Sequence, residues 1–466
     1  MISFKNILFA GMVCCGAAAA TSCQENEFGT VDLSMPEEDD SYVAVNYTYD
    51  YSNIAGLYSD ADFASVKQSL DDGTAPQAVK DEFQNLKASK YSQLTYMPDP
   101  QDEIVRGDAT GTATGKENYA YAMRDAAAAY QMALLWKLTG NDQYADKVVE
   151  ILNAWAAKCK KITSNDANQV LAAGAQGYTF ATAANIVKGY NGWSAAKQEQ
   201  FKQWMLTVFA TKNGDFLKTH TGSNVCAEHY WSNWDLVNMC SYMAIGIFAE
   251  DNDMVNYVVN YFYQGVGNGC IKRLIRGTHQ DPLGTGEIIC QNQESGRDQG
   301  HSEMSMVVTA NLAQMAWTLY QQNPACKELD FFSANDNAIL KMGEYVALFN
   351  LRNGSDNANK TGQWLVTAQQ MPFTKFEYCQ PGCGCKNTSH GAIHTQAADD
   401  EGRGNLRPGW EILVAHYGAN NGNIKYVKQM ADKILPEGGA GEALNRYGDN
   451  SGAFDQLGWS TIMLYK

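Results

Sequence analysis

Residues 139–155 read TGNDQYADKVVEILNAW, and this stretch decides the class of fold. Its large apolar residues recur at the spacing of one face of an α-helix: Tyr144, Val148, Ile151, Leu152 and Trp155. Just before them, Gly140 is suited to end one helix and Asn141 to cap the next. The stretch therefore predicts two helices joined by a tight turn.

The same helical spacing continues along the chain. It recurs in two further runs: Phe201, Trp204, Met205 and Val208, then Leu236, Met239, Cys240, Met243 and Ile247. Proline, which breaks helix interiors, is absent from Gln101 to Asp281. The Gly- and Thr-rich stretch from Ile271 to Cys290 is expected to be extended. More helices are expected at 171–189, 302–322, 336–350, 408–418 and 424–434.

Helical hairpins can stack into an open solenoid or close into a ring. The sequence has no repeat of fixed period, which a regular solenoid would show. The expected fold is therefore all-α, an α/α toroid built as an incomplete barrel of helical hairpins with long rim loops. Loops at one end of such a ring would surround a cavity able to hold a polymer.

Composition fits one large helical domain. Of 466 residues, 45% are hydrophobic, which excludes a disordered chain. Lys and Arg number 35 against 51 Asp and Glu, for a net charge of -16. That balance disfavours a nucleic-acid partner, because phosphate binding needs clustered cations and no run of them occurs. We expect residues 51–466 to form a single toroidal domain.

The N-terminal residues have the pattern of an exported protein. An apolar stretch follows Lys5 and ends in ATSC at residues 20–23, so residues 1–22 are predicted to be a secretory signal. Small residues before a cysteine resemble a bacterial lipobox, which would make Cys23 the acylated first residue. The alternative is an ordinary signal cleaved nearby.

With an acylated cysteine, contact with a membrane would be through the lipid anchor alone. No later stretch is apolar enough to span a bilayer. Residues 23–50 are expected to be an acidic tether, since seven acidic residues and no Lys or Arg lie between Gln24 and Tyr42. The expected location is the outer membrane or cell surface, with the folded unit facing either the exterior or the periplasm.

A group of cysteines and histidines late in the chain has two readings. Cys379, Cys383 and Cys385 lie just before His390 and His394. This spacing could hold zinc, but it lacks a CxxC pair and belongs to an exported chain, where a local disulfide is favoured. We expect no metal and no cofactor.

Two segments gather polar and aromatic residues just before apolar helices. The first is EHYWSNWD at Glu228–Asp235, which could simply start a helix with Asn233 or Asp235 as its cap. Its density of His, Tyr, Trp and Asn exceeds what a cap requires and is typical of carbohydrate sites, where rings stack on sugars and polar groups bind hydroxyls or carboxylates.

The second segment is QNQESGRDQGH at Gln291–His301, eleven positions without an apolar residue. A surface loop can be that polar, with Arg297 paired to Glu294 or Asp298 for little energy. However, the segment is held between an apolar strand candidate and a helix, and its glycines allow turns that would point Arg297 and His301 inward together.

Three motifs carry a resemblance to a known family. They are QESGRDQGH at 293–301, the Asn-Trp pair at Asn233-Trp234, and FDQLGW at 454–459. Together they resemble polysaccharide lyase family 38, which belongs to the alginate-lyase-like α/α toroids, over roughly residues 95–466. The resemblance implies a secreted, endo-acting lyase that cleaves a uronate polymer, alginate or glucuronan, by β-elimination. The implied partner is therefore an anionic polysaccharide.

β-Elimination requires three tasks. The substrate carboxylate must be neutralised, which suits Asn233 and Arg297, and a base must remove the proton at C5, which suits His301 with His229 in reserve. An acid must protonate the leaving oxygen. Two tyrosines are candidates, Tyr378 on a later loop and Tyr230 next to His229. Related lyases use a tyrosine from a later loop than the histidine, which favours Tyr378 here.

Further residues are expected to bind the substrate beside these catalytic ones. They are His229, Tyr230, Trp231, Trp234, Glu294, Gln299, Arg403 and Trp410. Two other functions stay open. A glycoside hydrolase could draw two carboxylic acids from Glu294, Asp298 and Glu303, and a surface lipoprotein could bind acidic glycans without cleaving them.

Overall fold

The computed structural model describes residues 42–107, 116–220, 227–353, 362–377, 393–420, 422–435 and 457–466. By their contacts, residues Leu33–Lys466 form one compact unit. None of the helices in the described ranges is long and apolar enough to cross a membrane. The signal and Cys23 lie outside the described residues, as do Tyr378, Cys379, Cys383, Cys385 and His390.

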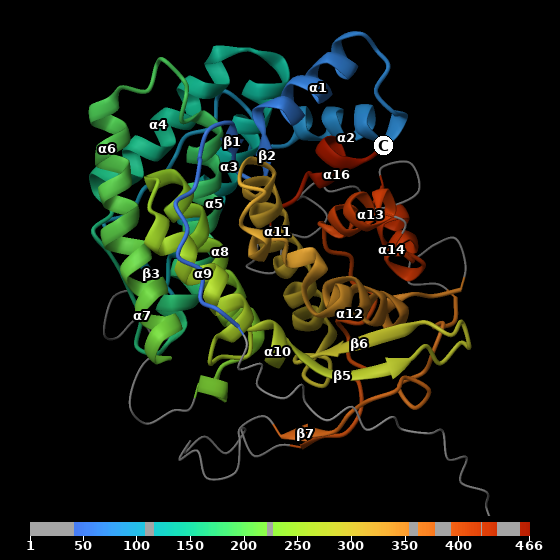
Figure 1. Cartoon of the computed structure of the whole chain (residues 1–466). Helices are drawn as coiled ribbons and strands as arrows, with labels where there is room; N and C mark the ends of the chain where they lie inside the picture. The colour runs from blue at the N-terminus through green and yellow to red at the C-terminus, as the bar shows by residue number, and fades with distance from the viewer. Residues whose placement is uncertain are drawn as a thin grey trace, which may run out of the picture. The chain divides into compact units, whose positions relative to one another are not determined.

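The described part of the chain is mainly helical (Figure 1). In chain order its helices are α1 (Asp60–Asp71), α2 (Gln77–Ala88), α3 (Tyr119–Thr139), α4 (Asp142–Lys158), α5 (Asn168–Val187), α6 (Ala195–Trp204), η1 (Met205–Ala210), α7 (Thr211–Thr219), η2 (Ala227–His229), α8 (Ser232–Ala249), α9 (Asn252–Gln264), α10 (Ile271–Leu274), α11 (Gln299–Gln322), η3 (Lys327–Leu329), η4 (Phe331–Ser333), α12 (Ala334–Asn350), α13 (Trp410–Ala419), α14 (Tyr426–Ile434) and α16 (Ser460–Leu464).

The strands are short and pair two by two. They are β1 (Ile54–Ala55) with β2 (Tyr58–Ser59), β3 (Glu103–Val105) with β4 (Lys161–Thr163), β5 (Ile275–Gln280) with β6 (Ile288–Asn292), and β7 (Phe376–Glu377) with β8 (Ile393–His394). The antiparallel β5–β6 hairpin packs on α12 and leads directly into the loop before α11.

A core of buried helices runs through the unit. Helices α5 and α8 lie parallel, because Gly174 packs on Val237 and Asn185, nearly three turns later, donates to the carbonyl of Ala244. Helix α11 continues the layer, since the Ser305 hydroxyl lies 3.1 Å from that of Ser232. The first residues of these inner helices therefore meet at one end of the unit.

The remaining helices complete a ring. Helix α3 packs on α5, and contacts continue from α11 through α13 and α16 to α1, which returns to α3. Helix α4 packs on α3, α9 packs on α8, and η1 and α7, which follow α6, pack on α5. The predicted all-α toroid of helical hairpins is therefore confirmed.

Most predicted helices are found within a few residues of their expected bounds. The turn predicted at Gly140-Asn141 forms as expected: Gly140 is left-handed at φ +72°, and the Asn141 side chain accepts from the Gln143 N–H. The stretch expected to be extended contains the β5–β6 hairpin. Helices α1, α2 and α9 go beyond the expected set.

The end of the predicted tether that the structure describes is held against α9. Val45 donates its N–H to Asn260 at 2.7 Å and accepts from the same amide at 2.9 Å. Tyr47 makes the same pair of bonds with Asn256, at 3.0 and 2.9 Å. Four helical residues rise about 6 Å, nearly the length of two extended residues. Asparagine side chains four positions apart on α9 can therefore bind every second peptide group of the extended segment. Val45 and Tyr47 are therefore bound to α9 through their backbones, while Asn46 and Thr48 between and beyond them are exposed.

We expect close packing between α5 and α8 to make Gly174 intolerant of a methyl group. A Cβ there would lie 2.6 Å from the Val237 side chain and 3.0 Å from its backbone. Gly174→Ala should lower the free energy of unfolding by about 1–3 kcal/mol, although alanine favours helix. Urea unfolding measures the change.

Gly189→Ala is the matched control, because nothing lies within 4 Å of a Cβ at Gly189. It should leave the unfolding midpoint unchanged or slightly raised. A Gly174→Ala protein as stable as the wild type would contradict the close approach of the two helices.

Candidate active site

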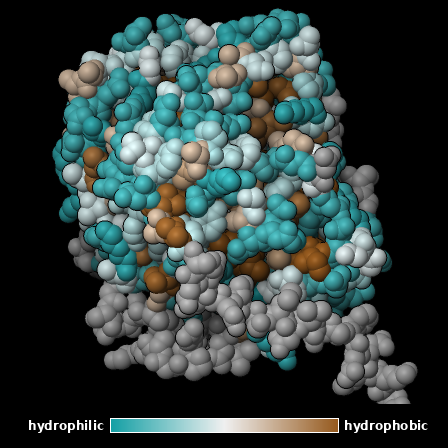
Figure 2. Space-filling view, viewed as in Figure 1, coloured by the Kyte–Doolittle hydropathy of each residue, from teal (hydrophilic) through white to brown (hydrophobic). Residues whose placement is uncertain are grey.

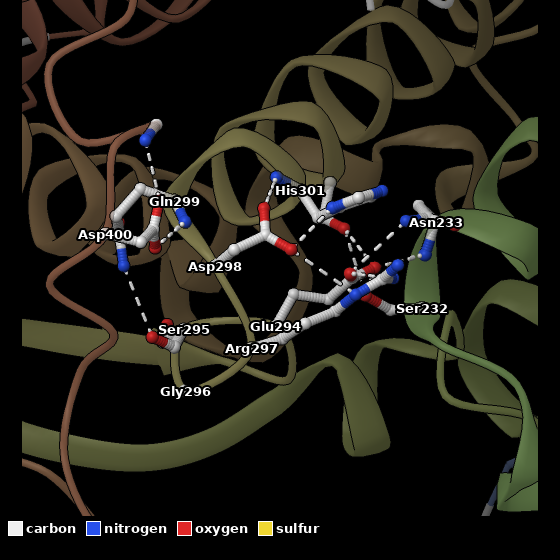
Figure 3. A network of polar contacts seen from close by, with 12 residues as sticks. Ser232, Asn233, Glu294, Ser295, Gly296, Arg297, Asp298, Gln299, His301 and Asp400 are labelled. Carbon is white, nitrogen blue, oxygen red and sulfur yellow. Dashed lines mark hydrogen bonds and ion pairs between the residues drawn. The ribbon is translucent and has the colours of Figure 1, made fainter. Parts of the chain in front are cut away.

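A fully buried carboxylate joins the two polar segments singled out in the sequence. Glu294 accepts from the Ser232 and Ser305 hydroxyls and from the Asn233 N–H, at 3.1, 2.9 and 2.8 Å. Its second oxygen accepts from the Asn233 amide at 3.2 Å and from Arg297 at 3.0 Å. Figure 3 shows Glu294 among these donors. The start of α8, the helix α11 and the Arg297 side chain are thus tied to one group.

The loop that carries Glu294 is shaped by its neighbours. The Asn292 side chain accepts from the Glu294 N–H and the Ser295 hydroxyl and donates to the Ser302 carbonyl, which folds the loop back on α11. At Gly296 a Cβ would lie 2.7 Å from that of His394. Only glycine leaves room for this approach, which explains why a glycine stands between Ser295 and Arg297.

Asp298 serves two purposes at the start of α11. One oxygen caps the helix by accepting from the His301 N–H at 2.8 Å, and the other lies 2.7 Å from His301 Nδ1. Burial alone would raise the pKa of Asp298, but its hydrogen bonds with His301 and the nearby charge of Arg297 lower the pKa below its usual range. An ionised Asp298 keeps the proton on Nδ1, so Nε2 of His301 presents a lone pair.

The His301 imidazole is the most exposed titratable group of this network. Its side chain is 40% exposed, against 25% for Arg297 and 0% for Glu294. In Figure 3 the imidazole extends from Asp298 toward the side on which Asn233 lies. A substrate can therefore reach the basic nitrogen without displacing the buried carboxylate.

A row of rings borders Arg297. The guanidinium lies 4.8 Å from the centre of the Trp231 ring, which meets His394 edge-on at 5.6 Å, and His394 lies 5.2 Å from Phe376. His394 Nδ1 lies 2.7 Å from the Gly296 carbonyl oxygen. Burial lowers the pKa of His394, opposed by that hydrogen bond, so the ring is neutral at pH 7 and donates through Nδ1. These rings are partly exposed and offer apolar faces.

Three of the four predicted catalytic residues come together. Asn233 and Arg297 share the Glu294 carboxylate, and His301 follows on the same loop. Asn233 is only 2% exposed, and its side-chain oxygen has no hydrogen-bond partner among the residues that the structure describes. The fourth predicted residue, Tyr378, lies outside the described residues.

The predicted binding residues fall into two groups. Trp231 borders the site, and His229 is partly exposed in the turn just before it. Tyr230 and Trp234 face inward, with ring centres 4.8 Å apart and both against Phe216. These two rings therefore support the turn from behind.

Four other predicted binding residues are interior, so the assignment of substrate contacts to them needs correction. Glu294 is fully buried and spends both oxygens on protein donors, while Gln299 is 1% exposed and donates to the Ser295 and Ala398 carbonyls. Arg403 is 2% exposed and donates to the Phe349 and Val366 carbonyls, and Trp410 is 1% exposed at the start of α13. In this conformation they hold loops together and do not face a substrate.

Two further residues contribute to the site. Asp298 as the partner of His301 follows from its spacing, since an N-cap aspartate lies beside the third residue of its helix. His394 could be recognised only as part of the cysteine and histidine group. No signal in the sequence places His394 beside Trp231. The contact of His394 with the Gly296 carbonyl joins residues that are ninety-eight positions apart.

Within the described ranges, no group of three or more His, Cys, Asp and Glu residues could hold a metal ion. The cysteine group lies outside those ranges, so the choice between a disulfide and zinc stays a prediction.

Comparison with known proteins gives one family and several solved structures. Residues 69–356 match the family model described as alginate lyase. Alginate lyase A1-III from Sphingomonas species A1 is 16% identical, covering 64% of this chain and 78% of that one, with a TM-score of 0.45. An alginate lyase from Bacteroides ovatus is 12% identical, covering 68% and 87%, also at 0.45. No curated protein matches the chain.

We expect Glu294→Gln to destabilise the protein strongly. The amide would place a donor against Asn233 or Ser305 and leave Arg297 without its buried counter-charge. Breaking a buried ion pair in this way costs about 3–5 kcal/mol. Thermal or urea unfolding measures the loss.

Glu401→Gln is the matched control, because Glu401 is exposed on the loop between Asp400 and Gly402. It should unfold like the wild type. Equal stability of the two variants would show that Glu294 does not hold the site together.

Proposed function

The chain belongs to the alginate lyase family, and we propose that it cleaves a uronate polymer, alginate or glucuronan, by β-elimination at the loop before α11. The observation that carries this proposal is the placement of Arg297 and His301 around one ionised Asp298, beside the partly exposed ring of Trp231. A cation for the substrate carboxylate and a basic imidazole meet two of the three needs of this elimination, and the aromatic ring offers a face on which a sugar can stack.

Arg297 is suited to neutralise the C6 carboxylate of the sugar that loses its proton. Its guanidinium gives one N–H to Glu294 at 3.0 Å and lies 3.4 Å from Asp298, which fixes its orientation and leaves other donors for substrate. Held donors of this kind stabilise the charge that develops on the carboxylate when C5 is deprotonated. Asn233 has one amide hydrogen left beyond its bond to Glu294 and is the second donor in the proposal.

His301 is suited to remove the C5 proton. Asp298 holds its Nδ1, so Nε2 accepts the proton and the resulting imidazolium is stabilised by the carboxylate beside it. The orientation of its imidazole by Asp298 supports His301 as the base. Protonation of the leaving oxygen is assigned to Tyr378 from the family resemblance.

The local charge is compatible with an anionic substrate. Glu294 accepts from the first turn of α8, and Asp298 caps α11. The positive end of a helix is equivalent to about half a charge, so the two helices and Arg297 together offset the two carboxylates. An incoming uronate therefore meets a site that is not negative, although the protein as a whole is acidic.

A glycoside hydrolase is less well supported by the same geometry. Hydrolysis needs two accessible carboxyl groups, and of Glu294, Asp298 and Glu303 only Asp298 is partly exposed. Burial raises the pKa of Glu303 well above its usual range, and Glu303 and Glu294 are both fully buried.

The lyase proposal predicts unsaturated products. Incubation of the full chain with polymannuronate, polyguluronate and glucuronan should produce ultraviolet absorbance from new double bonds with at least one polymer. His301→Ala and Arg297→Ala should each lower kcat by about 100-fold or more, because a base or a charge-stabilising donor is lost.

Lys428→Ala, which removes an exposed ion pair on α14, is the activity control and should behave as the wild type. New reducing ends without absorbance would indicate hydrolysis instead. Full activity in both site variants would refute the assignment of the site.

The Asp298–His301 pair can be tested without disturbing the helix start. Asp298→Asn keeps a good N-cap but turns an amide toward Nδ1, which favours the tautomer with its proton on Nε2. We expect kcat to fall by about 100- to 10,000-fold with little change in the midpoint of unfolding at neutral pH.

Asp298→Ala serves for comparison. It should lose the helix cap as well, which lowers the free energy of unfolding by about 1 kcal/mol. The folded-state pKa of Asp298 is lowered, so its contribution to stability is present above the ordinary carboxyl pKa and is lost as pH falls through the lowered value. Asp298→Asn should lack that part of the acid dependence. Unchanged kcat in Asp298→Asn would exclude His301 as a base oriented by this carboxylate.

A further inference from the structure

The row of rings beside Arg297 ends at a second arginine. Phe376 of β7, His394 of β8 and Trp231 before α8 form this row, and the Arg276 guanidinium lies 5.6 Å from the Phe376 ring centre. Arg297 lies at the other end, 4.8 Å from Trp231. Five side chains from separate segments thus form one row along an edge of the site, with a cation at each end and three rings between them.

Arg276 is held in place by the turn that carries Trp231. Its Nη2 donates to the Asn268 side-chain oxygen, and the Asn268 amide donates to the carbonyls of Glu228 and Tyr230 at 3.1 and 2.8 Å. Arg276 is therefore positioned relative to Trp231 by a chain of hydrogen bonds through a single side chain. A shift of one would move the other.

The Arg276 guanidinium forms no ion pair in the part of the chain that the structure describes. The charge of Glu228 acts on it from beyond ion-pair distance, whereas Arg273, three residues earlier, lies 4.0 Å from Glu228. The Arg276 Nε is buried and has no hydrogen-bond partner among the described residues. A largely buried cation with unused donors is costly to leave unpaired, and guanidinium groups pair best with carboxylates through two parallel hydrogen bonds.

We propose that Arg276 binds the carboxylate of a second uronate residue of the polymer, on the far side of the ring row from the sugar held by Arg297. The proposal rests on the function proposed above and adds a substrate requirement to it. The rings pack against the sugar faces between the two cations, and each cation takes one carboxylate. The site then selects polymers charged at both positions over those with a neutral sugar at one.

A kinetic comparison on the full chain tests the second carboxylate site. With the uronate homopolymer that the wild type cleaves best, Arg276→Ala should raise KM at least tenfold and leave kcat within about threefold, because binding is lost away from the reacting carbon. Arg276→Lys keeps the charge but not the paired donors, so its KM should lie between those of the wild type and Arg276→Ala. Arg273→Ala is the matched control from the same approach to β5 and should leave KM unchanged.

A binding measurement separates this inference from the proposed function. Calorimetry with the His301→Ala protein should give tight binding of the homopolymer and weaker binding of a partly carboxyl-reduced polymer. Adding Arg276→Ala should remove that difference. An unchanged KM in Arg276→Ala would overturn the second carboxylate site and leave the proposed lyase activity intact. So would equal changes of kcat and KM in Arg276→Ala and Arg276→Lys. Absence of elimination with every uronate polymer in the wild type would overturn the proposed function itself.

Discussion

The rest of the site depends on the burial of one carboxyl group, that of Glu294. Glu294 has no exposed surface, and it is stable there because five donors, one of them Arg297, surround its two oxygens. Those donors come from α8, from α11 and from the loop between β6 and α11. Each of these elements must therefore reach its final position for the carboxylate to be satisfied, and the same condition sets where Arg297 and Asn233 point.

Most of the helical architecture could be predicted from local information. Periodic apolar residues and the long interval without proline identify the inner helices, and Gly140-Asn141 marks a hairpin that forms with the expected cap. The polar segment 291–301 was recognisable because an apolar strand and a helix confine it. For the same reason its Arg297 and His301 are found together in the site.

What the sequence did not reveal depends on contacts between distant segments. Arg403 and Trp410 have the chemistry of substrate-binding residues, yet both are interior. The Arg403 guanidinium donates to the carbonyls of Phe349 and Val366. Asn256 looks like an ordinary polar helix position, although it binds the peptide group of Tyr47, more than two hundred residues away. Residue type alone does not tell whether an Arg, Trp or Asn serves the fold or a ligand, since the same hydrogen bonds serve both.

The acidic character of the chain and an anionic substrate are reconciled by where the charges lie. The face of the unit in Figure 2 is largely hydrophilic, with apolar residues in small separate groups. At physiological salt, exposed charges more than about 8 Å from the site are largely screened from it. At the site, Glu294 and Asp298 are matched by helix starts and Arg297. Arg276, which forms no ion pair with a described carboxylate, adds positive charge at the edge of the site. The sign of the field that a polymer meets is therefore set by a few paired and unpaired groups, not by the net charge.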